Sequence, residues 1–190
     1  MKELNMVSPE LVSYVEKHVF PVYKNNDEGH QYTHIKYVIN RSLKFAQQFG
    51  NVNYDICYVA AAFHDIGHHI DRKKHEIISA QLFMEDENMK KFFSEAERID
   101  IKEAIEDHRA SLQREPRSVY GKILSSADRS TSLNDCMKRV DAYTKAHYPD
   151  SDLYQRIQRA YEHISKKFGP GGYVKSYVQD SELDTFLKEV

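Results

Sequence analysis

The sequence predicts an all-α protein, a single helical bundle of about seven to nine helices. Apolar residues recur three and four positions apart along nearly the whole chain, which is the period of an amphipathic helix. The strict alternation of apolar and polar residues that indicates a half-buried strand is almost absent. Capping residues, prolines and glycines also divide the chain into segments of helical length. We therefore expect helices packed on helices, without a sheet.

Two helices are expected near the amino terminus. Ser8 precedes a proline and a glutamate, a pattern typical of a helix start, and predicts a helix over about residues 9–19. Thr33 is the candidate cap of the next helix, whose apolar stripe ends at Gly50. His34 falls in the first turn of that second helix.

A central helix is expected over residues 54–63, because this segment is apolar on nearly every side. His64 and Asp65 follow it directly, so the doublet lies where the most buried helix ends. A further helix is predicted over about residues 75–87, and His75 begins it.

Two more helices bring polar side chains toward the core. Ser94 and Glu97 form a capping box, and the apolar stripe of the helix that follows reaches His108 one turn later. Pro116 opens the next helix, in which Asp128 lies one turn beyond the last apolar position. Both side chains are therefore expected to point inward.

The last third of the chain is also predicted to be helical. Helices are expected over about residues 133–146 and 151–168. The breaker FGPGG at residues 168–172 then separates them from a short final helix capped by Ser181.

Length and charge limit the classes of protein. The chain has 190 residues, and typical domains have roughly 150, so one domain over residues 1–190 is expected. The 27 basic and 29 acidic residues give a net charge of −2 and a pI near 6.6, which disfavours bulk nucleic-acid binding. The two cysteines form no CxxC pair. No apolar run is long enough for a membrane span or a leader, so a soluble cytoplasmic protein is expected.

Six residues on different predicted helices carry groups that commonly bind metals: His34, His64, Asp65, His75, His108 and Asp128. Most of them continue apolar stripes or adjoin the apolar central helix, where an ionised carboxylate needs a partner. Four other histidines lie in polar segments without carboxylate partners and are assigned no role: His18, His30, His147 and His163.

The same residues carry a family resemblance. The segment AAAFHDIGHH at residues 60–69 contains the doublet followed by isoleucine and glycine, and the run ILSSADR at residues 123–129 ends close to the late aspartate. With His34 before this segment, and His75 and His108 after it, the chain resembles the HD-domain metal-dependent phosphohydrolases in their HDIG variant.

The resemblance covers about residues 30–130, which would form the metal-binding core, and leaves a C-terminal helical extension over about residues 133–190. It implies that one metal is bound by His34, His64, Asp65 and Asp128. It also implies a second metal at His75 and His108, with Asp65 as the bridge. The chain lacks the GYP element and paired histidines of the HD-GYP branch, and the acidic pair of the hydrolases of guanosine polyphosphates, so neither substrate is expected.

Imidazole and carboxylate ligands without thiolates suit iron, manganese, zinc, cobalt or nickel, so one or two divalent ions of open identity are expected. Two such ions would lower the pKa of a shared water toward about 7, which makes metal-activated hydroxide the expected nucleophile. A phosphate ester also needs donors or positive charge, and the candidates nearest in sequence are His68, His69, Arg72, Lys73, Lys74, Lys122 and Arg129. His68 is favoured, to hold phosphate or to protonate the leaving oxygen. Asp65 and His68 are therefore the candidate catalytic residues.

The leading hypothesis is a phosphohydrolase acting on a phosphomonoester or phosphodiester, with a nucleotide or a small phosphorylated metabolite as its substrate. Two alternatives use the same residues. One is a di-iron enzyme that activates oxygen at this ligand set. The other is a regulatory module that binds a nucleotide or metal without catalysis.

Overall fold

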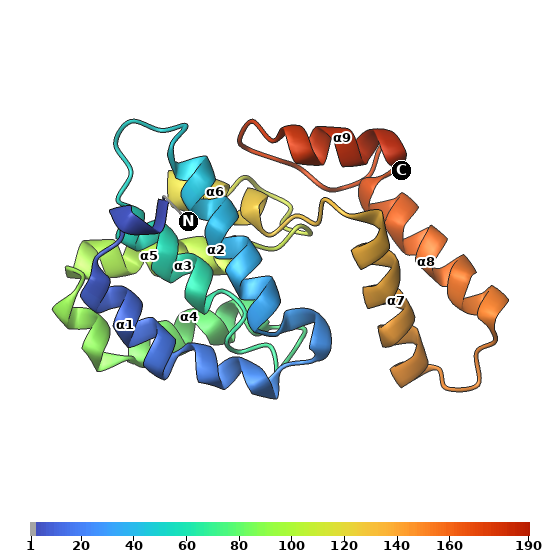
Figure 1. Cartoon of the computed structure of the whole chain (residues 1–190), viewed down its shortest axis with the longest axis horizontal. Coiled ribbons are helices and arrows are strands. Elements are labelled where there is room, and N and C mark those ends of the chain that lie inside the picture. The colour runs from blue at the N-terminus through green and yellow to red at the C-terminus, as the bar shows by residue number, and fades with distance from the viewer. Residues whose placement is uncertain (1–2) are drawn as a thin grey trace. The chain divides into compact units, whose positions relative to one another are not determined.

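The computed structural model describes residues 3–190, and across this range it contains α-helices and short 3-10 helices but no strand (Figure 1). The α-helices are α1 (Pro9–His18), α2 (Tyr32–Ala46), α3 (Tyr54–Phe63), α4 (His75–Glu85), α5 (Glu95–Glu106), α6 (Val119–Ala127), α7 (Leu133–His147), α8 (Leu153–Phe168) and α9 (Ser181–Glu189). The 3-10 helices are η1 (Glu3–Met6), η2 (Phe20–Asn25), η3 (Glu28–His30) and η4 (Glu87–Lys91). The all-α prediction is confirmed. Among the described residues, none of the helices has the length and apolarity needed to cross a bilayer.

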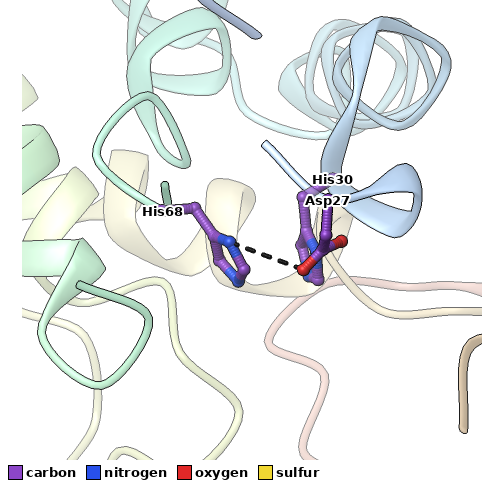
Figure 2. A group of neighbouring side chains, drawn as sticks. All are labelled: Asp27, His30 and His68. Carbon is purple, nitrogen blue, oxygen red and sulfur yellow. Dashed lines mark hydrogen bonds and ion pairs between the residues drawn. The ribbon is translucent and has the colours of Figure 1, made fainter. Parts of the chain in front are cut away.

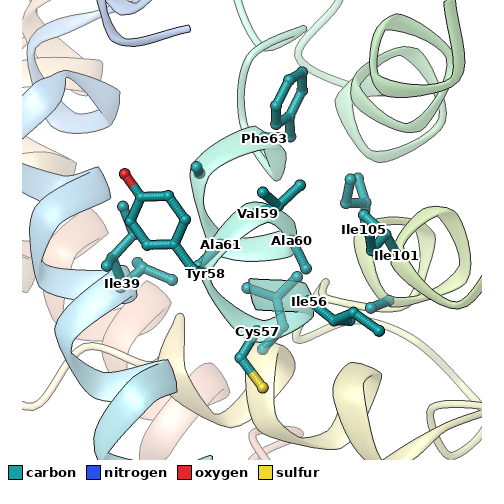
Figure 3. Close-up of a cluster of buried hydrophobic side chains, with 14 of the residues drawn as sticks. Ile39, Ile56, Cys57, Tyr58, Val59, Ala60, Ala61, Phe63, Ile101 and Ile105 are labelled. Atoms are coloured by element: carbon teal, nitrogen blue, oxygen red, sulfur yellow. The ribbon is translucent and has the colours of Figure 1, made fainter. Parts of the chain in front are cut away.

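Helix α3 is the centre of the first part of the chain. Its cap is Asn53, the residue before its first turn, whose side chain accepts a hydrogen bond from the backbone N–H of Asp55. Residues 56–63 are all buried. Helices α2, α5 and α6 pack around it. Figure 3 shows its side chains between Ile39 of α2 and Ile101 of α5. Each fully buried aliphatic side chain contributes roughly 1.5–3 kcal/mol to the free energy of folding. This packing therefore fixes the position of α3 and of the residues at its end.

The capping signals were informative in part. The capping box of Ser94 and Glu97 is present at the start of α5. Ser8 occupies the position before α1, although its hydroxyl donates to a glutamate instead of capping the helix. The prediction that Thr33 caps the second helix was wrong, because α2 already begins at Tyr32 and extended backbone precedes it.

Two further start signals were placed wrongly. Pro116 does not open α6, because the cap is Ser118, whose hydroxyl accepts from the N–H of Gly121. The final helix is capped by Asp180 and not by Ser181, since the Asp180 carboxylate accepts a hydrogen bond from the backbone N–H of Leu183. A cap needs an acceptor that reaches back to free N–H groups, and Ser118 and Asp180 supply it at these two helix starts.

The chain divides into two compact units, each with its own apolar core. The first unit extends to Asp128 and includes Ser176–Gln179, and the second contains Arg129–Lys175 and Asp180–Val190. Within the second unit, α7 and α8 pack against each other (Figure 1). Its core consists of Cys136, Ile164, Phe168, Leu183 and Phe186. The division lies close to the boundary expected between core and extension, and the single domain over residues 1–190 stays a prediction.

Gly67 lies in the turn that leaves α3, where the chain passes very close to α4. A Cβ atom at Gly67 would be 2.7 Å from Cγ2 of Ile78 and 2.9 Å from the backbone nitrogen of Ser79. The N–H of Gly67 also donates to the Ser79 hydroxyl at 3.0 Å. The glycine of the HDIG segment is therefore required by close packing, which brings the end of α3 against the start of α4.

Replacing Gly67 with alanine is expected to lower the free energy of unfolding by about 1–3 kcal/mol, because the added methyl group overlaps the backbone of α4. Gly50 is the matched control, since no atom lies within 4 Å of the position that its Cβ would take. Gly50→Ala is expected to change stability by no more than about 0.5 kcal/mol. Urea unfolding of both variants measures the difference, and equal midpoints for Gly67→Ala and the unmodified protein would show that the close approach is not maintained in solution.

Candidate metal centre

The structure brings together all six residues that the sequence singled out as metal ligands. They come from the start of α2, the end of α3, the start of α4, the segment after α5 and the end of α6: His34, His64, Asp65, His75, His108 and Asp128. Each side chain lies at or just beyond the end of a helix, where the packing around α3 brings these ends together. All six belong to the first unit.

The buried Asp65 carboxylate is at the centre of this group. Its Oδ2 atom is 3.6 Å from Nε2 of His34 and 3.3 Å from Nε2 of His64. Its Oδ1 atom is 3.2 Å from Nε2 of His75 and 3.7 Å from Nε2 of His108. The two oxygens of one carboxylate therefore face two different pairs of histidines, as a carboxylate that bridges two ions would.

The remaining contacts complete two overlapping sets of donors. Oδ1 of Asp128 is 3.2 Å from Nε2 of His34 and 3.8 Å from Nε2 of His64, so the first pair of histidines has two carboxylates. In the second pair, the Nε2 atoms of His75 and His108 lie 3.1 Å apart. One set thus offers two imidazoles and two carboxylates, and the other two imidazoles and the shared carboxylate.

Backbone carbonyl oxygens fix the orientation of three of the rings. Nδ1 of His64, His75 and His108 lies 2.8, 2.9 and 2.6 Å, respectively, from the carbonyl oxygen of the third residue before each histidine. A carbonyl oxygen only accepts, so each Nδ1 carries a proton and donates it. The Nε2 lone pair of each ring is then directed into the group, which is the arrangement found in metal-binding histidines.

The donor set fits a divalent metal ion. Nε2 of His64 is fully buried and makes no aligned hydrogen bond in the structure, although buried polar atoms are nearly always paired. The separations of 3.2–3.8 Å between the carboxylate oxygens and the imidazole nitrogens are those of atoms that share an ion with bonds of about 2.0–2.2 Å. Imidazole and carboxylate donors without thiolate leave iron, manganese, zinc, cobalt and nickel as candidates.

Burial and the two carboxylates set the charges of the metal-free centre. Burial alone would lower the pKa of His64, but the ionised Asp65 and Asp128 outweigh it and raise this pKa to about 9. For His108 burial prevails, and with the nearby His64 it lowers the pKa to about 3. Burial raises the pKa of Asp65, yet the neighbouring histidines hold it well below its usual value. One proton on His64 therefore compensates part of the carboxylate charge.

The candidate phosphate-binding residues are placed less uniformly. His68 is buried beside the centre, with its ring centroid 5.3 Å from that of His75, whereas His69 is exposed and contacts Asn26. Arg72, Lys73 and Lys74 form the exposed turn that precedes α4.

The last two cations of this group lie farther along the chain. Nζ of Lys122 is 3.1 Å from a carboxylate oxygen of Glu115. Arg129 belongs to the second unit, where it is buried and its Nε donates to the carbonyl of Lys175 at 3.4 Å. A part for any of these cations in binding phosphate stays a prediction.

The partner of His30 was not predicted from the sequence. His30 was assigned no role, but its Nδ1 donates to Oδ1 of Asp27 at 2.6 Å, and its ring stacks on that of His68 at 3.9 Å between centroids. The hydrogen bond from His30 lowers the pKa of Asp27 to about 2. Burial lowers the pKa of His68 to about 4, so this imidazole is neutral at physiological pH. The spacing of His30 three residues after Asp27 and four before His34 was the available signal.

Supporting contacts outside the six ligands were also not predicted. The buried Arg41 donates from Nε to the carbonyl of Ala127 at 3.2 Å, next to Asp128. Asp107, which precedes His108, accepts hydrogen bonds from the side chains of Arg114 and Arg117. These contacts fix the backbone on either side of the late ligands.

Comparison with known proteins places the chain in a family. The sequence profile of the HD domain matches residues 32–133, just over half of the chain, so the chain belongs to the HD-domain family. The fold is similar to that of a predicted HD superfamily hydrolase from an uncultured Thermotogales bacterium, known from its crystal structure. The TM-score is 0.52 at 22% sequence identity, and the similarity covers 82% of this chain and 84% of that one. No curated protein matches the sequence. Membership of the HD-domain family is thereby confirmed, and the HDIG variant and the phosphohydrolase reaction stay predictions.

Metal binding is expected to displace a proton from His64. With a pKa of about 9, this imidazole is protonated at neutral pH in the metal-free protein, whereas a metal ion requires the neutral ring. We expect the dissociation constant for Zn²⁺ to fall about tenfold per pH unit between about pH 6 and 8 for one displaced proton. Calorimetric titrations in two buffers of different ionisation enthalpy measure that proton, and a Zn²⁺ affinity independent of pH would contradict the expectation.

The same proton affects the stability of the metal-free protein. Because folding raises the pKa of His64 above its usual 6.5, protonation stabilises the fold fully below pH 6.5, and this contribution is lost as the pH rises through about 9. Addition of metal is expected to abolish the loss, because the ion then takes the place of the proton. Thermal unfolding at several pH values, with and without Zn²⁺, measures the effect.

Proposed function

We propose that this protein is a metal-dependent phosphohydrolase that cleaves a phosphomonoester or phosphodiester of a nucleotide or another small phosphorylated metabolite. The observation that supports this most strongly is the position of Asp65, whose two oxygens each lie within 3.7 Å of two histidine Nε2 atoms. A carboxylate shared in this way suits two adjacent cations, an arrangement that stabilises the attacking and leaving oxygens of an in-line displacement at phosphorus.

The residues divide into two candidate ligand sets. The first ion would be held by His34, His64, Asp65 and Asp128, and the second by Asp65, His75 and His108. Divalent ions at these positions supply an acidified water and neutralise charge that develops on the phosphoryl oxygens. Asp65 is in both sets, so it is the residue on which the spacing of the two positions depends.

His68 is the candidate for a direct contact with the phosphate. It lies beside His75, and its neutral ring at physiological pH offers one N–H donor. A pKa of about 4 makes it a weaker candidate for delivering a proton to the leaving oxygen, since a general acid works best with a pKa near the operating pH. Positive charge for the phosphate would come from Arg72, Lys73 and Lys122.

Membership of the HD-domain family supports hydrolysis. The similar Thermotogales protein is described as a predicted HD superfamily hydrolase, and we extend that reaction class to this chain as part of the proposal. The substrate is proposed from the divalent ions that the donor set would hold, because such ions bind phosphoryl oxygens. We expect a small molecule because the charge of the chain is nearly balanced.

Asp65→Asn is expected to lower the phosphohydrolase rate by about a hundredfold or more. Loss of a group that only hydrogen-bonds to a metal ligand typically costs about 10–100-fold in metal affinity or activity, and loss of a ligand costs at least as much. The assay measures phosphate release from nucleotides, a chromogenic phosphomonoester and a chromogenic phosphodiester after loading with Mn²⁺, Zn²⁺ or Fe²⁺. Asp100→Asn is the matched control, since this aspartate of α5 lies outside the group. Its activity is expected to equal that of the unmodified protein.

The same samples separate the alternatives. Oxygen consumption by the iron-loaded protein, without phosphate release, would replace the proposal with oxygen activation. Tight nucleotide binding without turnover under every metal would replace it with a regulatory role. Turnover by Asp65→Asn at the unmodified rate would overturn the assignment of the site itself.

A further inference from the structure

A second group of metal-binding side chains lies outside the six residues already described. Asp27 precedes η3, His30 ends it, and His68 lies in the turn after α3. Figure 2 shows the three side chains directed toward one another. One potential ligand atom from each lies within 4.8 Å of the other two. None of the three residues belongs to the six ligands around Asp65, which we call the Asp65 centre.

His68 is the member that indicates a missing ligand. Its side chain is only 6% exposed, and its ring makes no hydrogen bond among the described residues, since Oδ2 of Asp27 lies 3.7 Å from Nδ1. That distance is too long for a hydrogen bond. The other contacts of the ring are with the rings of His30 and His75. A largely buried imidazole without a hydrogen bond to the protein has both nitrogens open to a ligand that reaches the ring.

The segment that carries Asp27 and His30 is fixed in place by Asn26. The Asn26 side chain donates to the carbonyl of His30 at 3.1 Å and to the carbonyl of Asp65 at 2.9 Å. Its oxygen accepts from the backbone N–H of His69 at 3.1 Å. The two parts of the group are therefore joined by hydrogen bonds through one buried side chain, so the three donors are positioned before any ligand arrives.

We propose that Asp27, His30 and His68 form a separate site for one divalent transition-metal ion of the Zn²⁺ class. Two imidazoles and one carboxylate are a donor set that binds such ions and leaves coordination positions open for an outside ligand. Asp27 is half exposed, so the site is reachable from solvent. Binding of the ion to Nδ1 of His30 requires the ring proton to lie on Nε2, so the ion takes the place of the hydrogen bond between Nδ1 and Asp27. In the proposed hydrolysis, an ion here would contact the substrate in place of the His68 N–H. Binding of the ion itself does not depend on that reaction.

The test is the number of zinc ions bound per chain. The full chain is stripped with a chelator, dialysed against micromolar Zn²⁺ at neutral pH and analysed for zinc by mass spectrometry. Asp27→Asn and His30→Ala are each expected to bind one ion fewer than the unmodified protein. His69→Ala is the matched control, because it removes the exposed neighbouring histidine and leaves all three donors in place, and it is expected to bind as many ions as the unmodified protein.

Two combinations make the result decisive. Asp65→Asn is expected to lose zinc from the other centre but to keep the ion at Asp27, and adding Asp27→Asn to it is expected to remove that ion as well. Unchanged zinc content in both Asp27→Asn and His30→Ala would overturn the proposal. Asp27 is exposed, so its variant is expected to unfold at the same temperature as the unmodified protein in the absence of metal. No substrate is used, so failure of the proposed hydrolysis leaves this result unaffected.

Discussion

The buried charge of Asp65 is the constraint on which the rest of the first unit depends. An ionised carboxylate in a protein interior is costly unless charges and hydrogen-bond donors surround it. Here four Nε2 atoms lie between 3.2 and 3.7 Å from its oxygens. Three of those rings are held by backbone carbonyls, so they cannot turn away to other partners. Without metal, a proton on His64 supplies part of the compensation, and a cation held by the same atoms supplies more of it.

Helix packing explains why ligands so distant in sequence meet at this carboxylate. Helix α3 is apolar on every side, so α2, α5 and α6 can cover it all round, and each of them carries a ligand at or just beyond one end. The close approach at Gly67 then brings the start of α4, with His75, against the end of α3. The apolar core and the polar centre are thus two results of the same packing. A substitution that shifts α3 would move both.

Regular helices explain which parts were predictable from the sequence. The bounds predicted for the central helix, residues 54–63, agree with α3, and the inward positions of His108 and Asp128 followed from the helical period. The period contains no information on the segment between α1 and α2, where short 3-10 turns and the side chain of Asn26 decide the path of the chain. The contact between His30 and Asp27 therefore did not follow from the helical period, and only the spacing of these residues indicated it. The helix starts predicted at Thr33, Pro116 and Ser181 were wrong for a related reason. The backbone that enters a helix decides which of several polar residues can reach the free N–H groups of its first turn.

The ligands of the Asp65 centre differ in how far their side chains are exposed. His64 and His108 form its floor, with side chains 0% and 2% exposed. His34, His75 and Asp128 form the rim, at 11%, 12% and 21%. The rings of His30 and His68 lie beside this rim, 5.8 Å from the ring of His34 and 5.3 Å from that of His75, between centroids. The group of Asp27, His30 and His68 therefore adjoins the more exposed ligands of the Asp65 centre. In the proposed hydrolysis, a phosphate bound beside these ligands would lie near the two imidazoles, which gives them a place in recognition whether they act directly or through an ion.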